Sequence, residues 1–504
     1  MALQPAVSAP EDGPAEDLLE GQGRPPAHNA ALAAVAELIG KFSTLAWTIV
    51  AARELTQEDF GAFNLAFAIA IIAGAVAEGG FDQILVRRSS RDPRSINAYY
   101  TQAVTWELSL AVPVFTVAAA AVFLARPDGD VRAAVVLLLV ALFFDQWSDT
   151  ARAAAAAARD QARISGALAV QRLTAAALMI PALVAGLGVV GMAAGFLAST
   201  VVGWAAHVRA VRPLGLRFRW SAIDRARMFA FARGSWTLGI SALVLLAMFR
   251  IDVVILAALQ GDEAVGEYSA AYRLFETVLF LTWAVIGATA PLMNARAADR
   301  QEVRRLVESG LVVLGFVYAP FAAVCLAEGH AILELLYGER YVGATAAVQW
   351  LAAAPLAYAA AGVLGAALIA LGRLSAVALA ALGALVANVA LNLLLIPSLS
   401  GTAAALATTS AFAIEATLSL AFLSRLLPRL RIIAPLAETL AAAGVLALAL
   451  VVVSLPLLVE LPLGLAGYAA LWFALVRARR PERLDAVRAL LLRSRPPADA
   501  TGSA

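Results

Sequence analysis

Long apolar segments recur along almost the whole chain, and no other feature restricts its fold as much. Each is close to the twenty or so residues that an α-helix needs to cross a bilayer core of about 30 Å. The sequence therefore predicts an all-α polytopic membrane protein with about 14 transmembrane helices, because lipid must cover this much apolar surface. The segments lie at about 29–52, 59–80, 100–124, 131–155, 164–186, 190–210, 235–259, 266–291, 306–328, 344–371, 374–396, 401–424, 435–455 and 462–477.

The basic residues are distributed unequally between the two sides of these segments. Thirty of the 38 Lys and Arg residues fall in the two tails and in every second connection. The opposite side carries four, and four more lie inside the segments themselves. By the positive-inside rule, both termini are predicted to be cytoplasmic. The four on the opposite side are Arg53, Arg126, Arg132 and Arg340.

Composition agrees with a membrane protein and excludes several other classes. With 504 residues, 62% hydrophobic and 15% charged, the chain cannot bury its apolar surface in a soluble core. Its one cysteine, Cys325, excludes an internal disulfide, and neither this cysteine nor the three scattered histidines indicate a metal site. Residues 1–28 read as a disordered cytoplasmic tail and lack the basic start and apolar core of a signal peptide.

Two short stretches share one pattern and suggest an internal repeat. Residues 58–63 and 263–268 both read Glu, any residue, an apolar residue, Gly, any residue, an aromatic residue. Their glycines, Gly61 and Gly266, are separated by six predicted segments, and an even number of spans returns the chain to the same side. Two parallel lobes facing a central cavity are therefore expected, as in an alternating-access transporter. The predicted division is an N-lobe at 29–210, a cytoplasmic interfacial linker at 211–234, a C-lobe at 235–426, two further helices at 435–477 and a basic cytoplasmic tail at 478–504.

The linker mixes arginines with apolar and aromatic residues. Arg217 and Arg219 alternate with Leu216, Phe218 and Trp220. Such a mixture is typical of an element in the headgroup region whose cations face anionic lipid. We favour this interpretation over a regulatory element.

Four cations lie at membrane depth, where an ionisable residue is expensive unless a cavity or a partner receives it. Lys41 is the only lysine of the chain and sits about twelve residues from either end of the first segment, with Glu37 one turn before it. Arg273 and Glu276 repeat this pattern in the eighth segment. Each pair is either a self-neutralising structural pair or a cavity cation with an acidic partner. Arg172 and Arg250 are closer to an interface, so anchoring and function are equally compatible with them.

Seven acidic residues are also expected at membrane depth. Asp145 and Asp149 are four residues apart and share one helical face. Two like charges in a low dielectric raise the pKa of one of them, as a proton-coupled carrier requires. The alternative, which we favour, is that Arg152 neutralises Asp149 at the membrane edge. The seven are Glu37, Glu107, Asp145, Asp149, Asp252, Glu276 and Glu415.

Several stretches resemble one family, and their order along residues 29–430 is more specific than any single motif. The run ARELTQEDFG at 52–61 is similar to the first external loop of the Wzx-like polysaccharide or oligosaccharide-lipid flippases, members of the multidrug/oligosaccharidyl-lipid/polysaccharide (MOP) exporter superfamily. Where that family usually has two glycines after the proline that corresponds to Pro397, this chain has Ser400 and Ala403. The other matching stretches are 80–87, 250–252, 265–272 with Pro291, 336–341 and 388–397.

The resemblance implies twelve core helices in two lobes around a cationic cavity, plus two C-terminal helices. It implies a flippase of the bacterial cytoplasmic (inner) membrane that moves a polyprenyl-pyrophosphate-linked oligosaccharide to the outer leaflet for polysaccharide biosynthesis. Among the cavity cations of the family, Arg53, Arg250 and Arg273 fall in matched stretches, whereas Lys41 and Arg172 depend on the depth argument alone. No cofactor is expected beyond H⁺ or Na⁺ as a coupling ion. The predicted coupling or charge partners are Glu37, Asp145, Asp149, Asp252 and Glu276.

Three other functions stay open at this point. A drug exporter of the same superfamily would carry cations and so require an acidic cavity, and the four bases against seven acids at membrane depth do not exclude it. A membrane-embedded glycan polymerase or ligase would need a large external loop, and the longest one predicted is some fifteen residues, at 329–343. A scaffold for other glycan assembly proteins has only the long tails in its favour. The predicted partners are the lipid-linked oligosaccharide and membrane lipid, with no nucleic acid.

Overall fold

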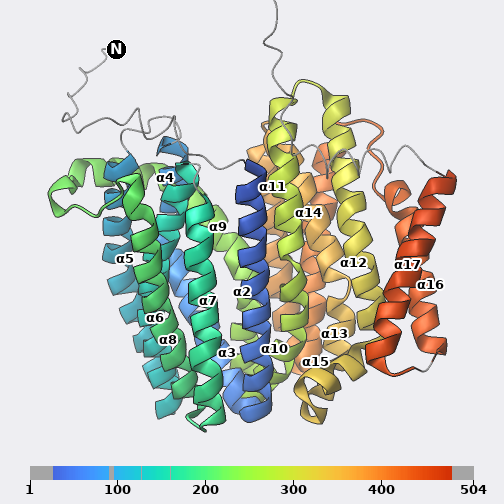
Figure 1. Ribbon diagram of the computed structural model, residues 1–504, viewed down its shortest axis with the longest axis horizontal. Coiled ribbons are helices and arrows are strands. Elements are labelled where there is room, and N and C mark those ends of the chain that lie inside the picture. Colours follow the sequence, from blue (N-terminus) through green and yellow to red (C-terminus); the bar gives the residue numbers. More distant parts are fainter. Residues whose placement is uncertain (1–25, 90–95, 127, 159–160, 454, 480–504) are drawn as a thin grey trace, which may run out of the picture.

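The computed structural model describes residues 26–89, 96–126, 128–158, 161–453 and 455–479. Within these ranges the chain is helical and contains no β-strand, which confirms the predicted all-α fold. Figure 1 shows long helices side by side, with the start of α2 and the end of α17 at the same end of the molecule. We name this the inner end, because the distribution of arginines predicts that it faces the cytoplasm, and the opposite one the outer end.

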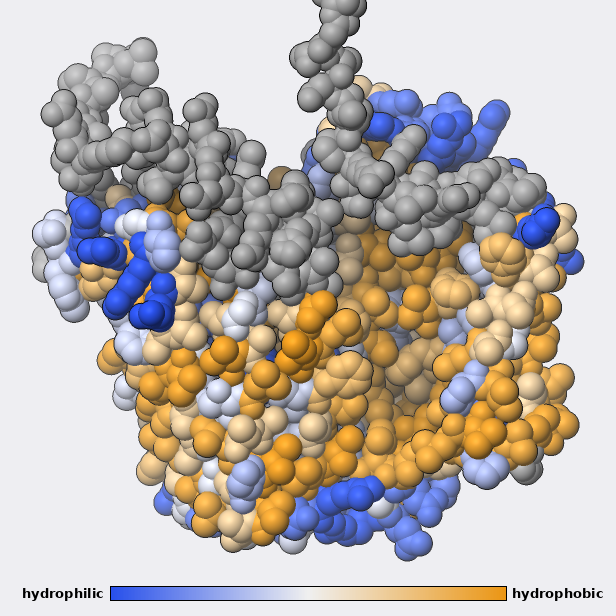
Figure 2. Space-filling view, in the orientation of Figure 1, coloured by the Kyte–Doolittle hydropathy of each residue, from blue (hydrophilic) through white to orange (hydrophobic). Residues whose placement is uncertain are grey.

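Apolar side chains cover the middle of the molecule in Figure 2, and hydrophilic ones gather at its two ends. Eleven helices in the described ranges are long and apolar enough to cross a membrane. Fourteen segments are expected, and part of the difference has a structural reason. One helix contains two of the expected segments, and the apolar stretch Leu436–Val452 is shorter than a full span.

The N-terminal half consists of six long helices and one short helix. The first and fifth long helices, α2 and α7, pack along each other, and α8 packs against both α6 and α7. The bounds are α2 (Pro26–Glu54), α3 (Gln57–Glu78), α4 (Phe81–Ser89), α5 (Ile96–Ala125), α6 (Gly129–Ala157), α7 (Gln161–Val184) and α8 (Gly188–Val211).

The short connection between α2 and α3 is fixed by its own side chains. Thr56 caps α3, since its hydroxyl oxygen accepts a hydrogen bond from the backbone N–H of Asp59 at 3.0 Å. At the other end Gly79 adopts φ 58°, the left-handed conformation that ends a helix without steric cost for glycine. The motif around Gly61 is thereby held in the first turns of α3, at the outer end.

The C-terminal half begins directly after two 3₁₀ turns, η2 (Arg212–Leu214) and η3 (Trp220–Ala222). Its first helix starts at Arg225, ten residues before the predicted start at 235, because no proline interrupts the sequence between these positions. The bounds are α9 (Arg225–Gln260), α10 (Asp262–Val278), α11 (Phe280–Ala295), α12 (Arg300–Tyr337), η4 (Glu339–Ala344), α13 (Thr345–Leu351), α14 (Ala354–Ala370) and α15 (Leu374–Ser424).

Two of the predicted segments are interrupted helices. The segment at 266–291 is divided between α10 and α11, which meet at Leu279, and the segment at 344–371 is divided between α13 and α14. The second break lies at Ala352 and Ala353, and Pro355 follows in the first turn of α14, where its missing N–H leaves no helical hydrogen bond unmade. The first break lies three residues after Glu276. It is therefore next to the predicted pair of Arg273 and Glu276.

Two last helices, α16 (Ile433–Val452) and α17 (Leu457–Arg479), pack against α12 at the side of the bundle (Figure 1). The hydroxyl of Tyr468 donates to the backbone oxygen of Phe316 at 2.9 Å, and the indole N–H of Trp472 donates to the hydroxyl of Thr439 at 2.9 Å. The first contact attaches the pair to α12, and the second joins α17 to α16. The predicted tails at 1–28 and 478–504 lie almost entirely outside the described residues.

A sharp bend divides α15 into the two segments expected there. At Ser400 the backbone has φ 49° and ψ −132°, a conformation that glycine adopts readily and other residues only with strain. This is one of the two positions where the resembling family usually has glycine. The departure from the family pattern therefore falls on a position where a side chain carries a conformational cost.

We expect Ser400→Gly to raise the free energy of unfolding by about 1 kcal/mol, because glycine removes the strain at φ 49°. Ala403→Gly is the matched comparison, since Ala403 lies in regular helix after the bend and glycine should destabilise it by roughly 0.5–1 kcal/mol. Thermal unfolding of the purified variants in detergent would measure both. Equal shifts of the two melting temperatures would contradict the assignment of strain to Ser400.

Candidate functional site

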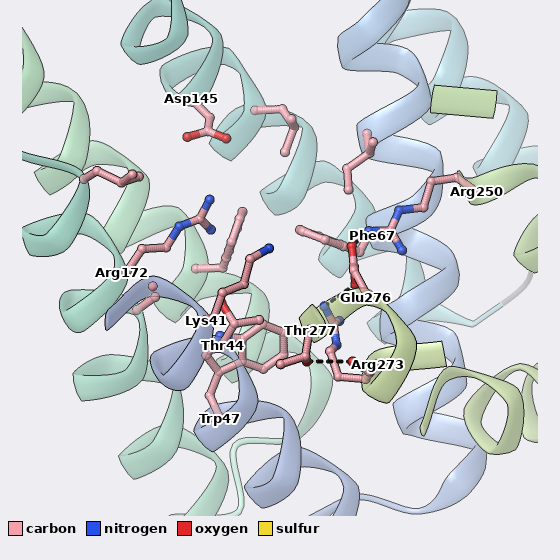
Figure 3. A pocket seen from close by; sticks show the side chains of 16 residues that line it. Lys41, Thr44, Trp47, Phe67, Asp145, Arg172, Arg250, Arg273, Glu276 and Thr277 are labelled. Carbon is pink, nitrogen blue, oxygen red and sulfur yellow. Dashed lines mark hydrogen bonds and ion pairs between the residues drawn. The ribbon is translucent and has the colours of Figure 1, made fainter. Parts of the chain in front are cut away.

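A cavity of about 240 Å³ lies between the two halves of the molecule. Its walls come from α2, α3, α6, α7 and α8 on one side and from α9 and α10 on the other. Four basic side chains, two carboxylates and three aromatic side chains line it, and Figure 3 shows the cavity from close by. The labelled residues are Lys41, Thr44, Trp47, Phe67, Asp145, Arg172, Arg250, Arg273, Glu276 and Thr277.

The four cations predicted at membrane depth all line this cavity. Lys41 on α2 and Arg172 on α7 approach from the N-terminal half, whereas Arg250 on α9 and Arg273 on α10 approach from the C-terminal half (Figure 3). Each half thus contributes two positive charges. Their role in binding a substrate stays a prediction, but the arrangement in space is the one that a central cationic cavity requires.

Glu276 joins the two arginines of the C-terminal half. One oxygen of its carboxylate accepts from Nη2 of Arg250 and the other from Nη1 of Arg273, each at 2.7 Å. One carboxylate therefore holds two guanidinium groups in place, with charge-assisted hydrogen bonds that are short and strong. Because the shared carboxylate supplies only one negative charge, one positive charge remains in excess in this group.

Aromatic rings fix the same two guanidinium groups from the side. The guanidinium carbon of Arg273 lies 5.6 Å from the ring centre of Trp47, and that of Arg250 lies 6.0 Å from Phe67 and 5.8 Å from Tyr272. Trp47 and Phe67 belong to the N-terminal half, so these cation–π contacts cross the cavity. The arginines are therefore preorganised rather than mobile.

Arg172 has a different environment. Among the residues that the structure describes, none accepts a hydrogen bond from its guanidinium group. Its stem packs against Gly40, where an added Cβ atom would lie 3.3 Å from Cγ of Arg172, and its backbone oxygen accepts a hydrogen bond from the Ser43 hydroxyl. The chain thus places the stem of Arg172 firmly while its charged end is available to a ligand.

The cavity contains fewer acids than the sequence predicts at membrane depth. Of the six whose side chains the structure describes, Asp145 and Glu276 line it. Asp145 accepts a hydrogen bond from Nε2 of Gln171 at 2.7 Å, a contact between α6 and α7. Among the described side chains, four basic and two acidic ones line the wall, an excess of two positive charges.

Two of the other predicted charge partners, Asp149 and Asp252, lie elsewhere. Asp149 forms an ion pair with Arg152, in agreement with the simpler interpretation of that pair. Asp252 is fully buried inside the C-terminal half, where it accepts hydrogen bonds from the hydroxyls of Tyr268 and Thr408, the latter at 3.2 Å. The side chain of Glu37 is outside the described part of the structure.

Arg53 lies at the outer end and does not line the cavity. Its Nε donates to the backbone oxygen of Leu336 at 2.9 Å and its Nη2 to that of Leu335 at 2.6 Å. Arg340 makes the reciprocal contact, since its Nη2 donates to the backbone oxygen of Arg53 at 2.7 Å. The resemblance implies a cavity cation at Arg53, but these donors are already used in joining α2 to the end of α12.

A third arginine of the outer end also connects the two halves. Arg126, just after α5, forms a two-pronged ion pair with Asp262 at the start of α10, with distances of 2.8 and 2.9 Å. Arg132 supports it, because its Nε donates to the backbone oxygen of Arg126 at 2.6 Å. All four arginines that the sequence places on the outer side are therefore engaged in closing this end.

The two glycines of the repeated motif meet each other in this closure. A Cβ atom on Gly61 would lie 1.7 Å from the backbone oxygen of Asp262 and 2.7 Å from the backbone nitrogen of Gly266. A Cβ atom on Gly266 would lie 2.0 Å from the backbone oxygen of Gln57. Only glycine at both positions lets α3 and α10 approach so closely. The repeat thus marks equivalent surfaces of the two halves.

Sequence reasoning missed the uncharged residues of the cavity. Thr44 and Trp47 lie on α2 beyond Lys41, and Thr277 is four residues after Arg273. Helical periodicity could have indicated them, because residues three or four apart share a helix face. Phe67 on α3 carries no such signal, since its neighbours in sequence are apolar on every side.

Comparisons with known proteins agree with this architecture. A protein family described as "Polysaccharide biosynthesis protein" matches residues 27–297. No curated protein matches the chain in sequence.

Solved structures share the fold over most of the chain. A structure titled "Lipid II flippase MurJ, inward closed conformation" superposes with a TM-score of 0.73, covers 89% of this chain and 99% of its own, and has 11% sequence identity. An inward-facing multidrug resistance MATE family transporter of the MOP superfamily gives a TM-score of 0.65 at 15% identity, with 80% and 98% covered. A MOP superfamily transporter from Pyrococcus furiosus, whose title refers to a reversed polarity of the binding pocket, gives 0.59 at 14% identity, with 82% and 98% covered. The fold is thus that of the MurJ and MATE proteins.

Proposed function

The chain belongs to the polysaccharide biosynthesis protein family, and we propose that it is a flippase for a polyprenyl-pyrophosphate-linked oligosaccharide. The headgroup of such a substrate carries its negative charge on the pyrophosphate, which cannot cross hydrocarbon unaided. The proposed path leads from the cytoplasmic to the outer leaflet of the cytoplasmic membrane. Both termini would then be cytoplasmic.

The excess of positive charge in the central cavity is the observation that carries this proposal. Two cations from each half surround the cavity, and among the described side chains two carboxylates line it with them. A phosphate group about 4 Å from one cation gains roughly 4 kcal/mol at an effective dielectric near 20. Arginine adds geometric fit, because its planar guanidinium group binds two phosphate oxygens at once.

The dimensions of the cavity fit the charged part of this substrate. A volume of about 240 Å³ admits a pyrophosphate but is smaller than the roughly 300–1,000 Å³ of typical ligand pockets. The halves must therefore separate to admit an oligosaccharide. The outer contacts of Arg53, Arg126 and Arg340 would open in the later step that releases the substrate to the outer leaflet, as alternating access requires.

A drug exporter of the same superfamily is the second candidate, because MATE transporters share the fold. Such an exporter, carrying cations, needs carboxylates free to receive them. Here Glu276 is held by two arginines and Asp145 by Gln171. This occupation of both carboxylates favours an anionic substrate.

A proton or a sodium ion is the proposed coupling ion, and Asp252 the carboxylate that responds to it. Asp252 is fully buried, and its contacts join α9 to α10 through Tyr268 and to α15 through Thr408. A change of its charge would act on three helices of the C-terminal half at once. We expect Asp252→Asn to make the rate of translocation in vesicles insensitive to imposed pH and sodium gradients; an unchanged response to both would contradict this role.

Reconstitution tests the function directly. The purified protein is placed in vesicles that contain polyprenyl-pyrophosphate-linked oligosaccharide with a fluorescent label, and the fraction of label accessible to a quencher outside the vesicles is followed over time. We expect exchange between leaflets with no chemical change of the lipid. Exchange of a lipophilic cation but not of the labelled glycan would support the drug exporter, and an elongated or transferred glycan would indicate a polymerase or ligase.

A further inference from the structure

A second basic pocket lies at the inner end of the N-terminal half, away from the central cavity. It has a volume of about 360 Å³ and is formed by η2 and the ends of α5, α6 and α8. Arg212 and Arg217 supply its charge, and Tyr100, Trp147 and Phe218 supply aromatic walls. The flippase mechanism proposed above uses none of these residues.

The pocket is built on a fixed frame. The backbone N–H of Arg217 donates to Oδ1 of Asn97 at 2.8 Å, so α5 holds the loop that carries this arginine. Val211 and Leu216 are buried beneath it and attach the loop to the core of the N-terminal half. A further hydrogen bond of 2.9 Å, from the indole N–H of Trp147 to the hydroxyl of Tyr100, fixes two of the walls. The backbone positions of the two arginines are therefore fixed.

The charge of this pocket is not neutralised by the described residues. The side chains of Arg212 and Arg217 are exposed, and within the described part of the chain neither forms an ion pair or a side-chain hydrogen bond. Three other arginines at the inner end are paired within the described residues. Their partners are Glu302 for Arg296 and Arg305, and Glu308 for Arg304. The charges of Arg212 and Arg217 are, in contrast, available to a ligand.

The neighbourhood places the pocket at the level of the lipid headgroups. Trp220 is 79% exposed and Phe229 is 67% exposed, although both are large and apolar. Aromatic side chains of this kind concentrate at the membrane–water interface. Figure 2 shows a hydrophilic patch at the left edge directly above apolar surface, at the position of the loop between α8 and α9 in Figure 1.

We propose that this pocket binds the headgroup of an anionic phospholipid, with its phosphate between Arg212 and Arg217 and its glycerol and upper acyl chains along the aromatic walls. Arginine pairs with phosphate oxygens through directed hydrogen bonds, and the apolar surface below receives the acyl chains. A soluble phosphate would use the two arginines but would gain nothing from that surface. The pocket is therefore matched to a lipid.

Native mass spectrometry of the full-length protein in mild detergent tests this binding. The probes are palmitoyl-oleoyl phosphatidylglycerol and the zwitterionic phosphatidylcholine with the same chains. The pocket variant is Arg212→Gln with Arg217→Gln. The matched control is Arg425→Gln with Arg431→Gln, which removes two exposed arginines from the same end of the C-terminal half. Thermal unfolding of each variant verifies that both are folded.

We expect the first phosphatidylglycerol to bind about tenfold more weakly to the pocket variant than to the wild type, with no change in the control variant. Phosphatidylcholine should bind weakly to all three proteins. Equal phosphatidylglycerol binding by the pocket and control variants would overturn the proposal, and so would equal binding of the two lipids to the wild type. Displacement of the lipid by glycerol phosphate at equal concentration would also overturn it, in favour of a site for soluble phosphate. None of these results depends on the substrate of the central cavity.

Discussion

Lys41→Ala and Arg273→Ala should each strongly slow the translocation of lipid-linked oligosaccharide while the protein remains folded in the membrane. The two residues face the same cavity from opposite halves. A charge-assisted hydrogen bond to a phosphate contributes roughly 1.5–3 kcal/mol, so the loss of one should lower the rate by about tenfold to a hundredfold. The fluorescence assay in vesicles, at equal protein content, measures this effect.

The structure explains why the fold should survive the loss of Arg273. After its removal, Glu276 keeps its ion pair with Arg250 at 2.7 Å, so this buried carboxylate is not left without a partner. Arg425→Ala is the control, because Arg425 is exposed at the inner end and outside both pockets. Wild-type rates in both cavity variants would exclude a role for the cationic cavity in translocation.

The overall fold could be predicted because lipid imposes it. A span needs about twenty apolar residues, so hydropathy alone places most of the helices. The helix breaks at Leu279 and before Pro355 could not be placed in this way, because a break depends on neighbouring helices that satisfy the freed backbone groups. The bend at Ser400 shows the same limit, since its serine gives no turn signal as strong as glycine.

The cavity could be predicted only in part. The part that could be predicted is the set of charged residues that the sequence places deep in the membrane. Lys41 and Arg172 are predicted from their depth in the membrane alone, and both line the cavity. A charge at that depth is costly unless it faces a cavity or a partner. Arg53 lies at the end of a span, where depth gives no information. Its acceptors, Leu335 and Leu336, are more than 280 residues away in sequence, so no local pattern could reveal that it joins the two halves.

Gly61→Ala should prevent the outer end from closing and thereby stop transport. Its added methyl group would lie 1.7 Å from the backbone oxygen of Asp262, and a backbone atom cannot move aside as the end of a flexible side chain can. The helices α3 and α10 must then separate, which disfavours the closed state by about 2–3 kcal/mol, or roughly a hundredfold in population. Gly266→Ala should act in the same way, since its methyl group would meet the backbone oxygen of Gln57 at 2.0 Å.

Accessibility of the cavity distinguishes this effect from simple loss of the fold. Thr44→Cys introduces a thiol into the cavity wall, and Cys325→Ser removes the only native cysteine. In right-side-out vesicles, a membrane-impermeant maleimide should label the introduced thiol far faster when Gly61→Ala is also present, because the cavity then stays open to the outside. Gly287→Ala is the matched control, since apart from the neighbouring backbone of its own helix nothing lies within 4 Å of its added methyl group. Equal labelling rates in the Gly61 and Gly287 variants would show that the contact between the two glycines does not govern closure of the outer end.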